Sequence, residues 1–402
     1  MAMIAPTRGQ IAELVQPYLE AQPSGLGFAI GYASPDFANH GGMEFFGNVK
    51  NQFGKQLTLG RATPFEIASI SKTFTAMLYA LLIRASHPDG TLGDYISPRG
   101  PLPISDALAT IKLDGLVNYT SGLPEDSVDN PVAVPPFQPQ PYAMPGMLSY
   151  LKESPPSLSR PNDSYSYSNL AFAIMSAVIA AEDNVSVPVV HAFVRKMREY
   201  VFKPLGLSAK FFNEASLAEL PLGFNYAYGP SPKYSHPGYW PQAPGHSLYP
   251  AYFGAHGIVA TSEDMFKWLL FNMGIMKDAK LTPLLSALQI PSTSVTDGWN
   301  NQLGLGWFIN RASDGWSASV FKDGALFSFG SYIAFLPSPN PGVVPSQAGA
   351  FALANADGLT ATQTPDGMAI TTVLVNDLLQ IMQGKTPPAD KTIYPQVARK
   401  TS

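Results

Sequence analysis

Strand-like segments near both ends of the chain, with helical segments between them, constrain the fold more than any other feature of this sequence. The patterns predict strands at residues 25–32 and 43–49, and again at 316–322, 331–336 and 350–354. Helical periodicity predicts helices at residues 8–20, 70–85, 169–182, 188–202, 262–273 and 370–383. Strands from the two ends can join one sheet while the middle of the chain forms helices, so the sequence predicts an α+β fold.

We expect the 402 residues to form two structural regions. Residues 1–85 and 251–402 would make an α/β domain from both chain ends, and residues 86–250 a largely helical domain with Pro-rich loops. Ten prolines fall within residues 124–161 and seven within 221–250. Long irregular segments of this kind are commonly binding or lid elements in compact domains, although a surface excursion without a role is the alternative.

Composition excludes several classes of protein. Hydrophobic residues make up 46% of the chain and charged residues 13%, which excludes a disordered protein. The net charge of −4, without a basic block, excludes a nucleic-acid partner held by phosphate contacts. With no cysteine there is neither a disulfide framework nor a thiolate ligand, and the six histidines lack paired metal spacing. We therefore expect no metal and no cofactor.

The longest apolar run, residues 170–181, is too short to span a membrane. The first residues lack the basic start and apolar core of a signal peptide. We expect a periplasmic or secreted protein if a leader has been removed, and a cytoplasmic one otherwise. We also expect a monomer.

Ser69-Ile-Ser-Lys72 stands at the start of the predicted 70–85 helix. A serine there is commonly an N-cap, but Lys72 lies three residues on and therefore on the same helical face. A serine hydroxyl becomes a nucleophile when a neighbouring base takes its proton, and a partly desolvated lysine could be that base. Backbone N–H groups at the helix start also suit a developing oxyanion. By itself the S-x-x-K spacing occurs by chance in many chains.

Tyr167-Ser168-Asn169 precedes another predicted helix. It is either an ordinary turn with an N-cap or a phenol placed to move protons beside an amide that donates and accepts. A phenol with a pKa of about 10 needs nearby cations to act as a base near neutrality. Lys72 is one candidate cation.

Lys322-Asp323-Gly324-Ala325 follows the predicted strand segment at 319–321. A hairpin turn is the simplest interpretation. In the functional interpretation, Lys322 is the second cation near Tyr167, and Gly324 permits close approach of a substrate. The N–H of Ala325 would then complete an oxyanion hole with the N–H of Ser69.

The three motifs in this order resemble the set found in β-lactamases and penicillin-binding proteins. With tyrosine in the central motif, the chain resembles the class C β-lactamase branch, which also contains D,D-peptidases, esterases and transacylases. Further segments that look like this family are residues 65–75, 118–124, 201–207, 252–265, 303–307 and 322–337. A G-x-S-x-G elbow is missing, which disfavours the α/β-hydrolase fold.

The resemblance implies a β-lactamase/D,D-peptidase-like fold, in which an antiparallel sheet carries N- and C-terminal helices and the active site lies between this domain and a helical one. It implies a covalent acyl-enzyme on Ser69, with Lys72 and Tyr167 handling the proton. Asn169 would position Lys72 and the substrate amide. Lys322 and Gly324 would help to bind substrate, and the oxyanion donors would be the N–H groups of Ser69 and Ala325.

The implied activity is hydrolysis of a small-molecule amide or ester, with the β-lactam amide as the family default. An esterase or an acyltransferase/D,D-peptidase on the same fold is the alternative, and a penicillin-binding sensor without turnover is a remote one. The third motif departs from the family, because Asp323 stands where a hydroxyl residue is usual. An aspartate whose side chain reached the site would repel a substrate carboxylate. Strand alternation predicts instead that Asp323 points away from the face of Lys322.

Overall fold

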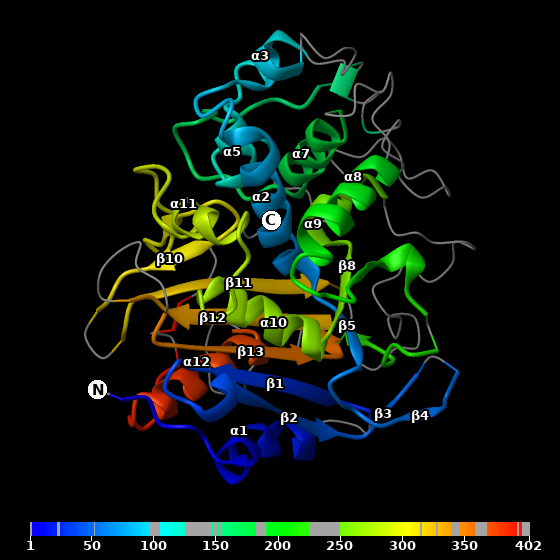
Figure 1. Ribbon diagram of the computed structural model, residues 1–402, viewed down its shortest axis with the longest axis vertical. Coiled ribbons are helices and arrows are strands. Elements are labelled where there is room, and N and C mark those ends of the chain that lie inside the picture. Colours follow the sequence, from blue (N-terminus) through cyan, green and yellow to red (C-terminus); the bar gives the residue numbers. More distant parts are fainter. Residues whose placement is uncertain are drawn as a thin grey trace.

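A seven-stranded sheet forms the centre of the computed structural model, in the order β2-β1-β13-β12-β11-β10-β9 (Figure 1). All of its pairings are antiparallel. The strands are β1 (Gly27–Ala33), β2 (Gly41–Gly47), β9 (Gln302–Leu303), β10 (Phe308–Asn310), β11 (Ser319–Leu326), β12 (Phe329–Leu336) and β13 (Ala348–Ala354). Both chain ends thus contribute to one sheet, and the α+β fold class predicted from the sequence is confirmed.

The structure describes residues 2–21, 25–51, 53–96, 105–124, 147, 151–152, 155–181, 190–216, 218–225, 250–313, 316–326, 329–338, 346–357, 368–391 and 394–395. Large parts of the Pro-rich segments 124–161 and 221–250 lie outside these residues, namely positions 125–146 and 226–249. The interpretation of those segments as binding or lid elements therefore stays a prediction, as does the division of the chain into domains.

Within the described residues, three small sheets accompany the large one. Their strands are β3 (Val49–Lys50) with β4 (Gln56–Leu57); β5 (Pro64–Glu66), β8 (Ile258–Thr261) and β6 (Lys210–Phe211); and β7 (Phe224–Asn225) with β14 (Ala356–Asp357). The β5-β8-β6 sheet leads directly into the site, because β5 ends two residues before the η2 turn that holds Ser69.

Helices cover both faces of the central sheet. In Figure 1, α10 (Ser262–Asn272) lies in front of the strands and α12 (Ile370–Met382) behind them, while α1 (Arg8–Ala21) packs against β2 and α12. This cover explains why the sequence of β12 and β13 does not alternate: every residue of both strands is buried. A strand with helices on both faces needs apolar or small residues on both.

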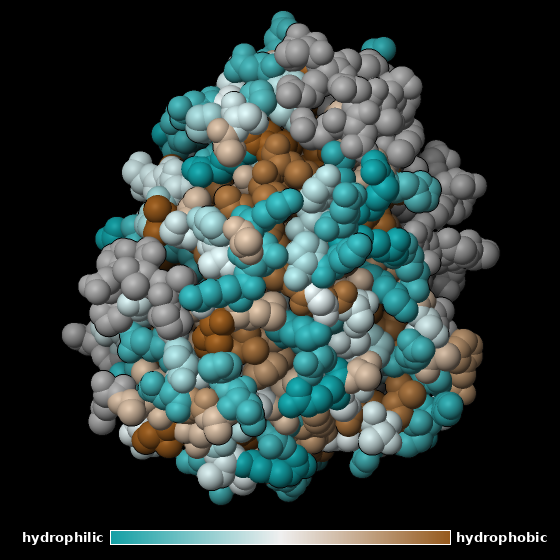
Figure 2. Space-filling model, viewed as in Figure 1, coloured by the Kyte–Doolittle hydropathy of each residue, from teal (hydrophilic) through white to brown (hydrophobic). Residues whose placement is uncertain are grey.

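The other helices of the described residues form a layer beyond β11 (Figure 1). They are α2 (Ser71–Tyr79), α3 (Leu92–Ile96), α4 (Asp106–Ala109), α5 (Leu113–Val117), α7 (Asn169–Ala181), α8 (Val190–Met197), α9 (Phe253–His256) and α11 (Leu285–Gln289). Shorter turns of other helical types are η1 (Ala38–His40), η2 (Ala68–Ile70), η3 (Ala80–Arg84), η5 (Arg198–Phe202), η6 (Phe212–Glu214), η7 (Pro250–Tyr252) and η8 (Thr282–Leu284). Figure 2 shows apolar surface gathered over the α5 and α7 region of this layer, between polar side chains.

Helix α2 is buried on every side, whereas the sequence pattern predicted a single apolar stripe. Two of its hydroxyls bond to neighbouring backbone: Ser71 Oγ accepts from Ile258 N at 3.2 Å, and Thr75 Oγ1 donates to Gly254 O at 2.7 Å. Ring stacking of Phe74 on Trp268, with centroids 3.8 Å apart, fixes the helix against α10. A helix in this position holds its side chains rigidly, which suits a catalytic framework.

No helix in the described part of the chain is both long and apolar enough to cross a membrane. The expectations about a leader, the compartment and the oligomeric state stay predictions.

Candidate active site

Ser69 lies in the η2 turn between strand β5 and helix α2. The residue before it, Ala68, has a φ of 46°, in the left-handed region that side-chain-bearing residues rarely adopt. The turn is held by backbone hydrogen bonds from Ile67 N to Ile258 O, at 3.1 Å, and from Ile70 N to Ile67 O, at 3.1 Å. Backbone strain of this kind persists only where the surrounding structure enforces it. Only 6% of Ser69 is exposed.

The Lys72 ammonium reaches back to Ser69 from the first turn of α2. Its Nζ lies 2.9 Å from Ser69 Oγ, 2.7 Å from Asn169 Oδ1 and 3.0 Å from Ala255 O. Lys72 is completely buried, so these oxygens replace the water that would otherwise solvate its amine. The structure thus brings together the predicted residues Ser69, Lys72 and Asn169. It adds Ala255, whose carbonyl carries no side-chain signal that the sequence could reveal.

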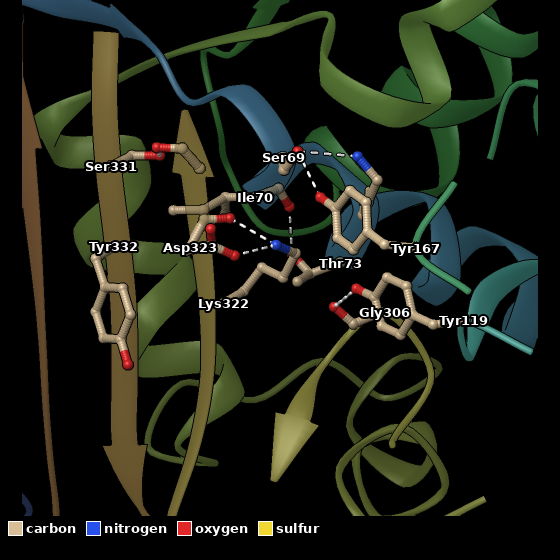
Figure 3. Close-up of polar contacts among 12 residues, drawn as sticks. Ser69, Ile70, Thr73, Tyr119, Tyr167, Gly306, Lys322, Asp323, Ser331 and Tyr332 are labelled. Carbon is tan, nitrogen blue, oxygen red and sulfur yellow. Dashed lines mark hydrogen bonds and ion pairs between the residues drawn. The ribbon is translucent and has the colours of Figure 1, made fainter. Parts of the chain in front are cut away.

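Tyr167 stands in the segment just before α7, and its side chain points toward Ser69 (Figure 3). Its hydroxyl donates to Ser69 Oγ at 2.9 Å. The Lys72 and Lys322 ammonium groups lie 5.0 Å and 5.4 Å from the centroid of its ring. Both cations that the sequence suggested therefore lie beside this tyrosine, at cation–π distance from the ring.

Two further aromatic residues hold Tyr167 in place. Tyr119 stacks on it with centroids 5.5 Å apart, and also on Phe308 at 4.6 Å. The Tyr119 hydroxyl donates to Gly306 O at 2.9 Å. Burial, followed by the nearby Tyr167, raises the pKa of Tyr119 well above its ordinary value, so this phenol stays protonated. Tyr119 belongs to the family-like segment 118–124, but no local pattern in the sequence indicates a role for it.

Lys322 lies inside strand β11, not at its end as the sequence suggested, because β11 continues to Leu326. Its Nζ donates to two oxygens of the next residue: Asp323 O at 2.7 Å and Asp323 Oδ1 at 2.6 Å (Figure 3). The expectation that strand alternation keeps Asp323 away from Lys322 was wrong. A lysine side chain is long enough to fold back along the strand, so that its amine meets the carboxylate of its neighbour.

Gly324 packs tightly against the turn that carries Ser69. A Cβ at this position would lie 2.3 Å from Ser331 Oγ and 2.6 Å from Ile67 O. Only glycine lets β11 approach this closely. Ala325 follows in the same strand and pairs with Gly330 of β12. The assignment of the Ser69 and Ala325 N–H groups as oxyanion donors stays a prediction.

Two buried titratable groups are close in sequence to residues of the site: Glu66 precedes Ser69 by three positions, and His256 follows Ala255. Burial, reinforced by the positive charge of Lys72, lowers the pKa of His256 to about 3, so its imidazole is neutral at ordinary pH. Burial raises the pKa of Glu66 well above its ordinary value, and its Oε1 atom has no hydrogen-bond partner. Among the described residues, no cluster of three or more histidine or acidic side chains could hold a metal ion.

Comparison with known proteins gives the chain its family. The model of the Beta-lactamase family matches residues 24–373. A beta-lactamase of Yersinia enterocolitica is 25% identical over an alignment 357 residues long, gaps included, which covers 85% of this chain and 78% of that protein. A beta-lactamase of Escherichia coli strain K12 is 24% identical over an alignment 331 residues long, which covers 72% of this chain and 76% of that protein.

Solved structures show the same fold at lower identity. A class C beta-lactamase superposes with a TM-score of 0.67 at 18% identity, over 92% of this chain and 94% of that one. The octameric penicillin-binding protein homologue from Pyrococcus abyssi superposes with a TM-score of 0.68 at 15% identity, over 94% of this chain and 78% of that one. The family match spans most of the sequence and the fold agrees with it, so the chain belongs to the beta-lactamase family of serine hydrolases.

Proposed function

We propose that the protein hydrolyses a small acyl substrate through a covalent intermediate on Ser69, with the amide of a β-lactam as the first candidate substrate. One observation carries this proposal: Lys72 Nζ and the Tyr167 hydroxyl both lie 2.9 Å from Ser69 Oγ. A serine flanked by two groups that exchange protons is the arrangement that nucleophilic catalysis requires. Family membership supports the same chemistry.

The contacts of Lys72 favour it as the base. Asn169 Oδ1 and Ala255 O can only accept hydrogen bonds, so they take two N–H groups of the amine. The third free position around the Lys72 nitrogen faces Ser69 Oγ. In the neutral amine that position carries the lone pair, which would take the hydroxyl proton as Ser69 attacks the carbonyl carbon.

Tyr167 would complete the proton path. As the tetrahedral intermediate collapses, the bond from carbon to the leaving group breaks, and the leaving atom needs a proton. The Tyr167 hydroxyl, hydrogen-bonded to Ser69 Oγ, is placed to deliver one and to recover it from Lys72. Water would then attack the acyl-enzyme and pass its proton through the Tyr167 hydroxyl to the neutral amine of Lys72. Ser69 Oγ would take that proton back as the acid leaves. The backbone N–H groups of Ser69 and Ala325 would stabilise the oxyanion that forms in acylation and again in deacylation.

Ester hydrolysis is the second candidate, and the ion pair between Lys322 and Asp323 favours it. In the related lactamases, the lysine of the third motif helps to hold the substrate carboxylate. Here that ammonium already donates to the Asp323 carboxylate at 2.6 Å. Simple esters do not need a carboxylate for recognition, so this pairing does not impede them.

Mass spectrometry of the intact protein tests the proposal. A cephalosporin and a short 4-nitrophenyl ester are each mixed with wild type, with Ser69→Ala, and with the control Ser216→Ala, which changes an exposed serine. We expect one acyl mass per chain in wild type and Ser216→Ala, and none in Ser69→Ala. An adduct on another residue, or none with either reagent, would contradict the proposal. Repeated turnover would exclude a sensor that only acylates.

A further inference from the structure

The ammonium of Lys322 is already engaged within the chain. It donates to Asp323 O at 2.7 Å and to Asp323 Oδ1 at 2.6 Å, so one neighbouring residue takes two of its three N–H groups. The rings of Tyr167 and Phe308 lie 5.4 Å and 5.5 Å from the same nitrogen. The Lys322 side chain is fully buried, whereas the Asp323 side chain is 20% exposed.

This difference in exposure sets the order in which a ligand meets the two charges. A molecule entering from solvent can reach the Asp323 carboxylate, while the ammonium behind it is covered. A carboxylate on that molecule would meet a like charge, and it could reach Lys322 only by displacing Asp323 from a buried partner. Opening a desolvated ion pair is costly, and bringing like charges together adds to that cost.

We infer that Asp323 determines substrate specificity. Its carboxylate occupies the position in which the Lys322 ammonium would otherwise bind a carboxylate of the substrate. The substrates it selects are esters or amides whose leaving group is uncharged beside the scissile bond. Substrates that carry a carboxylate at that position are rejected. This inference rests on the proposed acyl-enzyme function, and it concerns the choice of substrate, not the chemistry at Ser69.

The test compares two aryl esters of one acid, the phenyl ester and the 3-carboxyphenyl ester, which differ only in a carboxylate on the leaving group. The ratio of kcat/KM for the two esters is measured in wild type, in Asp323→Asn and in Asp323→Thr. Asp323→Asn keeps the shape of the side chain and removes its charge. Asp106→Asn removes the same charge from an exposed helix start and serves as the control. Circular dichroism and Tm show that each variant is folded.

We expect wild type and Asp106→Asn to prefer the phenyl ester. Each Asp323 variant should shift the ratio toward the carboxylated ester by about tenfold or more, which corresponds to ~1.4 kcal/mol, near the low end for a hydrogen bond to a charged group. A wild type that prefers the carboxylated ester would overturn the inference. The inference would also be overturned if the ratio of kcat/KM for the two esters agreed within about twofold in all four proteins.

A binding measurement separates this inference from the proposed function. Dissociation constants of the two esters are measured by calorimetry for Ser69→Ala and for Ser69→Ala combined with Asp323→Asn, neither of which should turn the esters over. The same shift in the ratio is expected there. If turnover is missing in wild type but the binding ratio shifts, the acyl-enzyme proposal fails and the specificity inference stands. If the binding ratio is unchanged while wild type turns over, the specificity inference fails alone.

Discussion

The ring of Tyr119 lies nearly parallel to the ring of Tyr167, with the two planes inclined by 9° and the centroids 5.5 Å apart. A backbone hydrogen bond from Ser166 N to Tyr119 O, at 2.7 Å, ties the same two segments together. Tyr119 itself has a φ of 64°, in the left-handed region. The loop after α5 therefore acts as a support that fixes the direction from which Tyr167 reaches Ser69.

Removing this support should slow acylation. We expect Tyr119→Leu to reduce the acylation rate more than Tyr119→Phe, because phenylalanine keeps the ring that stacks on Tyr167. The loss of the aromatic pair is worth about 0.5–1.5 kcal/mol beyond the buried area. The main effect of Tyr119→Phe should be a loss of stability, because Gly306 O loses the hydroxyl that donates to it at 2.9 Å. Stopped-flow acylation with an activated ester measures the first effect and thermal unfolding the second. Equal acylation rates in the two variants would contradict a positioning role.

Lys72 should be needed for chemistry and not for folding. In Lys72→Met the amine that contacts Ser69 Oγ is lost while the length of the side chain is nearly kept. Loss of a general base reduces rates by roughly 10²–10⁴-fold, and we expect a decrease in kcat/KM of that order. The control Lys267→Met removes an amine whose hydrogen-bond partner is Gly206 O, a backbone atom outside the site, and it should retain activity. Near-normal acylation by Lys72→Met would rule out this lysine as the base.

Gly324 should tolerate no side chain. The Cβ of Gly324→Ala would lie 2.6 Å from Ile67 O, a backbone atom in the turn before Ser69, so either β11 or that turn must move. Overpacking of this kind costs about 1–3 kcal/mol of stability, and we expect acylation to fall as well. The control Gly60→Ala places its Cβ in open space. The Cβ of Gly324→Ala would also lie 2.3 Å from Ser331 Oγ. Removing that clash in the double variant Gly324→Ala/Ser331→Ala should restore little activity. Full recovery in that double variant would show that Ile67 O is not the obstacle.

The sequence predicted the fold class and the proximity of Lys72 to Ser69 because both depend on local patterns. Strand and helix periodicity placed β1, β12, β13 and α12 within a few residues of their observed bounds. The S-x-x-K spacing placed Lys72 beside Ser69 because one helical turn separates them, which the 2.9 Å contact bears out.

What the sequence could not reveal depends on contacts between distant segments or on exceptions to a local rule. The Ala255 carbonyl that holds Lys72 lies 183 positions along the chain from it and carries no side-chain signal. The complete burial of α2 depends on which helices pack around it, because its own sequence mixes polar and apolar residues. The ion pair between Lys322 and Asp323 contradicts strand alternation, since a flexible lysine can turn toward its neighbour.

Glu66 should make the stability of the protein depend on pH. Because burial raises the pKa of Glu66 well above its ordinary value of 4.5, the folded protein keeps this carboxyl protonated where the unfolded chain has already lost the proton. The contribution of Glu66 to the free energy of unfolding is therefore fully present below pH 4.5, and it is lost as the pH rises from there through the folded-state pKa. Within that interval the free energy of unfolding should fall by about 1.4 kcal/mol per pH unit relative to Glu66→Gln.

Urea unfolding of wild type and Glu66→Gln between pH 4 and 8 measures this difference. The two curves should converge at the acid end and separate as the pH rises, with the variant the more stable of the two. Glu13→Gln, at an exposed position of α1, should follow wild type throughout. Curves that stay parallel across the whole range would mean that Glu66 ionises in the fold as readily as in the unfolded chain. The carboxyl would then need a partner or solvent access that its unpartnered, buried Oε1 atom does not have.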